Sequence, residues 1–348
     1  MSRSTHARVS GFCALASSPL LVACNAVLGI AEPSGQILEE VPDASGLGLG
    51  NDDAPRNSST GDAGIVFGTI LPPAASPRAR WPMPTAADSG LPHTQMYKTA
   101  ESGVVRDERT QLEWQQKVDG TARTHEDAKD YCETLSLAGG GFRLPSRIEL
   151  ASVLDLTQPS PAIDAKAFPS TPPERFWTSS GYRAAPESAW VVSFSFSTSH
   201  VTGDSALEKH LVRCVRESED SAPGAASAPE AGDNTVRDTS TGLEWQRYVV
   251  KHSIGYQEAV EHCALMDLEG ARYRLPTLKE LHTLVDESRV APATDTELFP
   301  ETPARSFWTQ TQVANFGEYT WTVDFQDGSD LWVSAPTTAL VRCVRNLD

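Results

Sequence analysis

Two segments of the chain repeat apolar residues with the period of a helix. In the first, between residues 124 and 137, the apolar face consists of Ala128, Tyr131, Cys132 and Leu135. The second segment lies 131 residues later, and its face consists of Ala259, His262, Cys263 and Met266. Spacings of three and four residues place such side chains on one side of an α-helix. We therefore predict an amphipathic helix in each segment, with Thr124 as the N-cap of the first.

Two further helix starts follow Arg-Leu-Pro sequences. Ser146 and Glu149 stand three residues apart after the first of these sequences, and Thr277 and Glu280 after the second. This is the spacing of a capping box, in which the hydroxyl accepts from the N3 amide and the glutamate reaches back to the N-cap amide. We expect a helix of about ten residues after each box. The expected helices span residues 147–156 and 278–287.

Short runs of alternating apolar and polar residues occupy much of the remaining sequence in these regions. The clearest are residues 190–194, 211–216, 320–325 and 340–345. Alternation with a period of two is typical of a half-buried strand. Helical segments that precede a group of strands favour the α+β class with an antiparallel sheet.

Several motifs occur twice, so the chain contains an internal repeat. Leu-Glu-Trp-Gln begins at residues 112 and 243, Phe-Trp-Thr at 176 and 307, and Leu-Val-Arg-Cys-Val-Arg at 211 and 340. The offset is 131 residues for the first two motifs and 129 for the last. An offset this constant indicates two copies of one domain. We place the first repeat at residues 97–217 and the second at residues 234–348.

Composition changes outside the repeats. Residues 24–96 are rich in Ala, Gly, Pro, Ser and Asp and show no sustained period, so we expect a disordered tether there. Residues 218–233 are acidic and rich in Ala and Pro, which predicts a flexible linker between the repeats. A linker of 16 residues permits the two repeats to move independently.

The first 23 residues have the features of a secretory signal peptide. Arg3 and Arg8 precede a short apolar stretch, which ends in Leu-Val-Ala before Cys24. This ending resembles the lipobox of bacterial lipoproteins, and the resemblance implies that Cys24 is lipidated and anchors the protein to a membrane. Asn25 then favours the outer membrane of a diderm bacterium. The alternative is an ordinary signal peptide that happens to be followed by a cysteine.

The charge of the chain narrows the classes of partner. Lys and Arg number 29 and Asp and Glu number 46, which gives a formal net charge of −17. Such a surface repels nucleic acid, so we expect no nucleic-acid partner. Outside the N-terminus no run of eighteen apolar residues occurs, so the sequence predicts no membrane-spanning helix there.

The repeated motifs resemble the C-terminal domain family of the Legionella collagen-like protein. The pattern of that family includes Thr-Gly-Leu-x-Trp, a helix that carries a cysteine, Arg-Leu-Pro-Thr and Val-Arg-Cys-Val-Arg. Both repeats match nearly all of these motifs, although Phe142 and Tyr273 stand where the family usually has Trp, and Gln111 replaces a Gly. The resemblance implies a C-type-lectin-like fold, with two helices on a twisted antiparallel sheet in each repeat. It also implies a surface adhesin that binds sulfated glycosaminoglycans.

Four cysteines lie in the two repeats, two in each, and allow three pairings. A duplicated domain should carry its disulfide within each copy, and the lectin-like resemblance implies the same bond, from the first helix to the last strand. We therefore expect Cys132–Cys214 and Cys263–Cys343. A metal site is disfavoured because the two cysteines of each repeat are far apart and form no Cys-x-x-Cys motif.

Two arginines and one tryptophan are candidate ligand-binding residues. Arg143 and Arg274 occupy equivalent positions, where they either bind an anionic ligand or form internal ion pairs with acidic residues of the same repeat. The tryptophans that recur in both repeats are expected in the core. Trp332 has no counterpart in the first repeat and is a candidate sugar platform.

Candidates for metal binding and catalysis are few. Asp324, Asp327 and Asp330 lie near a glycine, where they either coordinate calcium or form an ordinary hairpin turn. The sequence contains no recognisable hydrolase, zinc-protease or nucleotide-binding motif. We expect no enzymatic activity, no cofactor and no metal.

These observations favour a lipid-anchored cell-surface protein that binds a ligand or mediates adhesion. Both repeats are net acidic, so a neutral glycan, a cationic ligand or a protein fits the charge better than a sulfated glycan. The alternative is a structural lipoprotein of the cell envelope without a soluble ligand.

Overall fold

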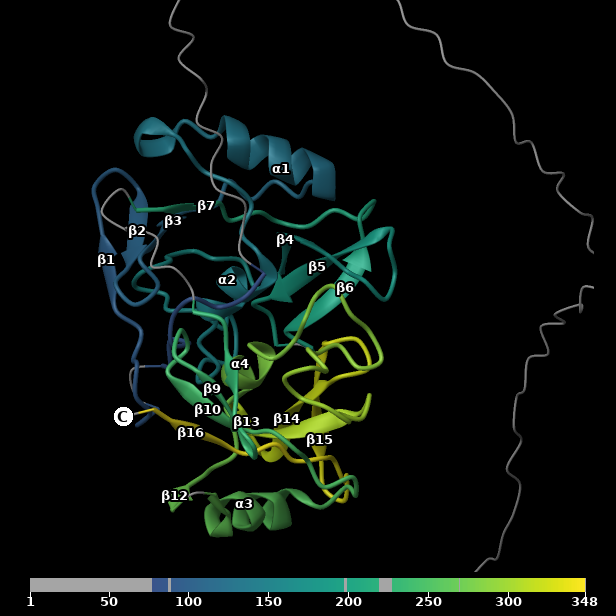
Figure 1. Ribbon diagram of the computed structural model, residues 1–348. Helices are drawn as coiled ribbons and strands as arrows, with labels where there is room; N and C mark the ends of the chain where they lie inside the picture. Colours follow the sequence, from purple (N-terminus) through teal and green to yellow (C-terminus); the bar gives the residue numbers. More distant parts are fainter. Residues whose placement is uncertain (1–76, 87–88, 197–198, 219–226, 269, 348) are drawn as a thin grey trace, which may run out of the picture. The chain divides into compact units, whose positions relative to one another are not determined.

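The computed structural model describes residues 77–348, apart from 87–88, 197–198, 219–226, 269 and 348 (Figure 1). The predicted signal peptide, Cys24 and most of the predicted tether lie outside the described residues. The described residues belong to one compact unit that holds both repeats. No helix in the described part of the chain is long and apolar enough to cross a membrane.

The first repeat is mostly β and contains two antiparallel sheets. One sheet has the strand order β1-β2-β3-β7, and the other has the order β4-β5-β6 (Figure 1). Its strands are β1 (Tyr97–Thr99), β2 (Val104–Asp107), β3 (Leu112–Gln115), β4 (Arg175–Gly181), β5 (Ser188–Ser193), β6 (Val201–Ser205) and β7 (Val215–Glu217). Its helices are α1 (His125–Thr134), the 3-10 turn η1 (Leu137–Gly139) and α2 (Arg147–Ser152).

The second repeat has the same arrangement. Its sheets have the orders β16-β10-β9-β8 and β13-β14-β15, and β11 and β12 form a small additional ribbon. Its strands are β8 (Glu230–Ala231), β9 (Thr235–Asp238), β10 (Leu243–Gln246), β11 (Asp267–Leu268), β12 (Ala271–Arg272), β13 (Ser306–Val313), β14 (Phe316–Asp324), β15 (Asp330–Ser334) and β16 (Val344–Asn346). Its helices are α3 (Tyr256–Leu265) and α4 (Leu278–His282). The expected antiparallel sheets are present, but strands precede the first helix of each repeat as well as follow it.

The helix signals in the sequence correspond to real helices. Thr124 caps α1, since its hydroxyl accepts from the Asp127 amide. Both predicted capping boxes are formed, one by Ser146 and Glu149 at α2 and one at α4. These local interactions satisfy amide groups that have no partner within the helix.

The predicted length of α2 and α4 is wrong, because they have six and five residues instead of about ten. The chain leaves the helix where Leu154 forms a β-bridge with Ile163. Just beyond, the Asp155 carboxylate accepts from the amide and the hydroxyl of Thr157, at 3.0 and 2.6 Å. Such a side-chain turn competes with the next helical turn, and Asp286 forms the same turn in the second repeat.

Repeated tryptophans form the centre of each core, as predicted. They are at most 2% exposed and include Trp114, Trp177, Trp190, Trp245, Trp308 and Trp321. Two disulfides add to this core, Cys132–Cys214 and Cys263–Cys343. Each bond joins a helix to the residue just before the last strand of the same repeat, so the predicted pairing is confirmed.

The predicted tether ends earlier than expected. Trp81 is only 6% exposed and packs into the first core, while Met83 packs against Ile148. Arg80 forms a 2.7 Å ion pair with Glu217. The prediction of disorder up to residue 96 is therefore wrong for the described residues after 76, because isolated apolar side chains are buried there without any periodic pattern.

Part of the predicted linker is also structured. Residues 230 and 231 form β8, which pairs with β9 at the edge of the second repeat's sheet. The linker segment 219–226 lies outside the described residues.

Candidate functional site at the junction of the repeats

The two repeats pack against each other through α2 and α4, the helices that follow the capping boxes. Arg147 of α2 is fully buried and crosses into the second repeat. Its Nε donates to Glu287 Oε1 at 2.9 Å, and its Nη2 donates to the carbonyl of His282 at 3.2 Å. A buried guanidinium with these partners fixes one repeat against the other, so the described repeats do not move independently.

Lys279 crosses the junction in the opposite direction. Its Nζ donates to the carbonyls of Ser152 and Leu154, at 2.9 and 2.7 Å. Burial lowers the pKa of Lys279 to about 7, although the more distant Asp155 and Asp107 favour the charged form. The equivalent residue in the first repeat is the apolar Ile148, so this buried cation belongs to the second repeat only.

Two histidines and an aspartate complete the polar part of the junction. Asp330 Oδ1 accepts from the His200 amide at 2.7 Å and from the Ser199 hydroxyl at 2.8 Å. His282 Nδ1 lies 3.2 Å from a nitrogen of Arg147, which can only donate, so Nδ1 accepts and the proton is on Nε2. That Nε2 donates to Asp330 Oδ2 at 3.1 Å. Burial lowers the pKa of His282, which keeps the ring neutral.

The three aspartates that could have bound calcium serve separate structural roles. Asp330 belongs to the junction. Asp327 Oδ2 accepts from the Tyr182 hydroxyl of the other repeat at 2.7 Å. Asp324 accepts from the Gln326 amide at 2.8 Å within the turn. In the described part of the chain, no three His, Cys, Asp or Glu side chains are grouped so that they could hold a metal ion.

The arginines predicted as anion-binding candidates form internal ion pairs. Arg143 donates through both terminal nitrogens to Glu149, at 2.7 Å each. Arg274 forms the same fork with Glu280, at 2.8 Å each. The glutamates are those of the capping boxes, so each arginine braces the start of a helix.

Another arginine of the first repeat, Arg213, donates to neutral acceptors. It is fully buried, and its Nη1 donates to the carbonyls of Gln115 and Gln116, at 2.6 and 2.8 Å. Its Nη2 donates to the Thr171 hydroxyl, and Arg342 makes the equivalent contacts in the second repeat. Burial lowers the pKa of Arg213 to about 9.

Trp332 belongs to a cluster of four aromatic side chains, which we call the aromatic patch: Phe196, Phe316, Tyr319 and Trp332. Phe196 of the first repeat and Phe316 of the second stack with ring centres 5.0 Å apart, and they are 45% and 41% exposed. Trp332 is partly buried, stacks toward Phe196 and meets the edge of Tyr319 at 4.6 Å. A hollow of about 200 Å³ lies among these rings, Val313 and Glu318.

The described part of the first repeat has no equivalent patch, because its residues differ at the same positions. Trp332 pairs with Trp321 in the β-ladder, as Gly203 pairs with Trp190. The ring of Tyr182 lies against Gly203, where a Cβ atom would collide with it. Sequence reasoning singled out Trp332 as unmatched but missed Phe196 and the two other rings, which approach it only through the fold.

Comparison with known proteins supports the repeat structure. The family model described as the Lcl C-terminal domain matches residues 103–216 and again residues 234–345. No curated protein matches the chain. The two matches together cover more than half of the sequence, and the chain therefore belongs to the Lcl C-terminal domain family, of which it carries two tandem copies.

Proposed function

We propose that this protein binds a ligand outside the cytoplasm and that the aromatic patch is its contact surface. The observation that carries the proposal is the stack of exposed Phe196 and Phe316 beside Trp332. Exposed apolar surface of this kind is typical of an interaction site. Membership of the family is consistent with a ligand-binding or adhesion role.

The ligand we propose is a neutral glycan. Flat aromatic faces accommodate the apolar face of a sugar ring, and the Glu318 carboxylate beside the hollow can accept hydrogen bonds from hydroxyl groups. A sulfated glycan fits less well, because both repeats are net acidic and both Arg143 and Arg274 are already paired with glutamates. A lectin-like fold and a role without catalysis are parts of the same proposal.

The proposed location is the cell surface. Disulfides persist in oxidising compartments outside the cytoplasm, and both repeats contain one. The lipid on Cys24 and residence in the outer membrane extend this proposal, and they rest on the sequence before Asn25.

Binding of the full chain to an array of neutral and sulfated glycans tests the proposal. We expect neutral glycans to bind, and we expect Trp332→Ala and Phe316→Ala each to weaken that binding at least tenfold. Leu207→Ala is the control, because Leu207 is 84% exposed and lies outside the patch. Equal binding by all three variants would refute the role of the patch, and a blank array with folded protein would favour the structural-lipoprotein alternative.

A further inference from the structure

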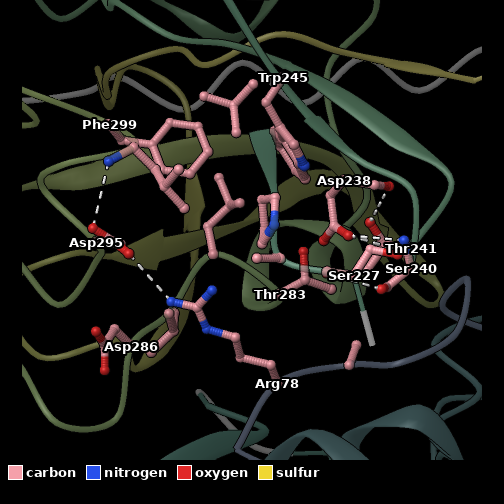
Figure 2. A pocket seen from close by; sticks show the side chains of 17 residues that line it. Arg78, Ser227, Asp238, Ser240, Thr241, Trp245, Thr283, Asp286, Asp295 and Phe299 are labelled. Atoms are coloured by element: carbon pink, nitrogen blue, oxygen red, sulfur yellow. Dashed lines mark hydrogen bonds and ion pairs between the residues drawn. The ribbon is translucent and has the colours of Figure 1, made fainter. Parts of the chain in front are cut away.

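The second repeat contains a cavity of about 170 Å³ that is distinct from the aromatic patch (Figure 2). The buried rings of Trp245 and Phe299 line one side of it. The partly exposed carboxylates of Asp286 and Asp295 and the exposed Arg78 lie on another side. A cavity with an apolar inner wall and a charged outer edge has the form of a small-molecule site.

In the first repeat a tyrosine side chain occupies the equivalent position. The edge strand β1 pairs with β2 so that Tyr97 lies opposite Asp107. The edge strand β8 pairs with β9 in the same way, and its register, continued by one residue, places Pro229 opposite Asp238. Pro229 therefore stands where the first repeat has Tyr97, and it lines the cavity.

The surroundings of the Tyr97 ring match the walls of the cavity. The ring meets the edge of Phe168 at 5.1 Å, and the equivalent residue Phe299 lines the cavity. Burial raises the pKa of the Tyr97 hydroxyl, and the nearby carboxylates of Asp107 and Asp164 raise it further. Their counterparts in the second repeat are wall residues too: Asp238 and Asp295. The cavity therefore corresponds to the space that the Tyr97 ring fills in the first repeat.

The size of the cavity agrees with this interpretation. An apolar cavity of about 150 Å³ is large enough to bind benzene. Trp245 is fully buried in the wall, and its Nε1 has no acceptor in the described part of the chain. The equivalent nitrogen of Trp114 is also without an acceptor there, although the Tyr97 ring is present, so this group does not require a ligand oxygen. The volume of the space accommodates one six-membered ring.

We propose that the second repeat binds a small phenolic amine in this cavity. The ring takes the place that the Tyr97 ring has in the first repeat. The amine faces the carboxylates at the charged edge of the cavity, because the three aspartates of the walls outnumber the two arginines that contact them, Arg78 and Arg289. Arg78 contacts Asp295 at 3.3 Å and Arg289 contacts Asp286 at 2.9 Å, so the three carboxylates exceed the two arginines by one negative charge, which favours a cation.

The test is a calorimetric titration of the full chain with three phenols of different charge. We expect tyramine to bind at least tenfold more tightly than 4-hydroxyphenylacetate, with the neutral p-cresol between them. Pro229→Tyr restores the residue of the first repeat and should reduce tyramine binding at least tenfold. Glu230→Tyr is the matched control, because neighbouring residues of a strand point to opposite faces and Glu230 is exposed.

A second variant tests the same proposal by gain of binding. Tyr97→Ala removes the ring from the first repeat and should raise the number of tyramine sites from one to two. The disulfide of the mutated repeat, Cys132–Cys214 or Cys263–Cys343, and the circular dichroism spectrum report whether each variant is folded. The proposal is overturned if none of the phenols binds at millimolar concentration, or if Pro229→Tyr binds tyramine as the parent does. If Pro229→Tyr does not fold, an unchanged stoichiometry in Tyr97→Ala overturns it.

Discussion

Replacement of Lys279 by Met should change how the stability of the protein depends on pH. The Lys279 ammonium is buried at the junction of the repeats, and burial lowers its pKa from 10.5 to about 7. One unit of pKa corresponds to about 1.36 kcal/mol, so this difference amounts to at most roughly 5 kcal/mol. Gln95 Nε2 also donates to the Leu154 carbonyl at 3.1 Å, so that acceptor keeps a donor in the variant.

The sign follows from the protons that each state binds. Between pH 7 and 10.5 the unfolded chain keeps the Lys279 proton while the folded protein has released it. The unfolded state then binds more protons, so the free energy of unfolding rises with pH in this range. Lys279→Met lacks this contribution. The parent should therefore gain stability relative to the variant between pH 7 and 10, by several kcal/mol.

Urea unfolding at pH 7, 8, 9 and 10, followed by tryptophan fluorescence, measures this difference. Other groups that titrate in the range cancel, because they are common to both proteins. Lys251→Met is the control, since Lys251 is exposed and its ion pair with Glu301 lies at the surface. A difference between parent and Lys279→Met that stays constant from pH 7 to 10 would refute the reasoning and show that the folded protein keeps the proton.

Three further substitutions test the junction, a helix cap and a disulfide. Arg147→Met leaves the nearly buried Glu287 without its partner and should lower the free energy of unfolding by about 3–5 kcal/mol in urea titrations. Lys251→Met removes one member of an exposed ion pair, and an equal loss of stability in that variant would contradict this expectation. Ser146→Ala removes a cap and should cost about 1 kcal/mol in the same assay, and no change would mean that the cap is redundant. Replacement of both Cys132 and Cys214 by Ala opens a loop with a sequence separation of 82 residues and should cost about 4.5 kcal/mol, so an unchanged urea midpoint would contradict the bond.

Features that depend on neighbouring residues, or on the internal repeat, could be predicted from the sequence. The capping boxes were predictable because Ser146 and Glu149 interact within one turn. The disulfide pairing was predictable because the duplication limits each bond to one repeat. The length of α2 was not, because a helical pattern alone does not show that Asp155 turns the chain.

Contacts between distant segments could not be predicted in this way. A tryptophan in a segment rich in Ala and Pro gives no periodic signal, yet Trp81 is buried in the first core. The stack of Phe196 on Phe316 joins residues from different repeats, and only the packing at the junction brings them together. The Arg147–Glu287 pair has a sequence separation of 140 residues and is equally invisible to pattern analysis.

Positions where the two repeats differ mark the features that the duplication has not kept. Where the residues match, as with the tryptophans and the capping boxes, they form the same core and the same helix starts in both copies. Where Ile148 becomes Lys279, the junction gains a buried cation. In a symmetric interface between two identical domains, both copies would contribute the same side chains. Divergence at a few positions allows one copy to supply the cation and the other its carbonyl acceptors.

The same comparison separates the candidate sites from the scaffold. Gly203 in the first repeat corresponds to Trp332 in the second, and this exchange contributes a ring to the aromatic patch. Tyr97 corresponds to Pro229, and this exchange leaves the cavity beside Trp245. The second exchange removes a buried ring, and such a loss would destabilise a single domain that used the ring for its core. A second copy that is already braced by the junction and by its own disulfide can tolerate such a loss, which is why we expect binding to be concentrated in the second repeat.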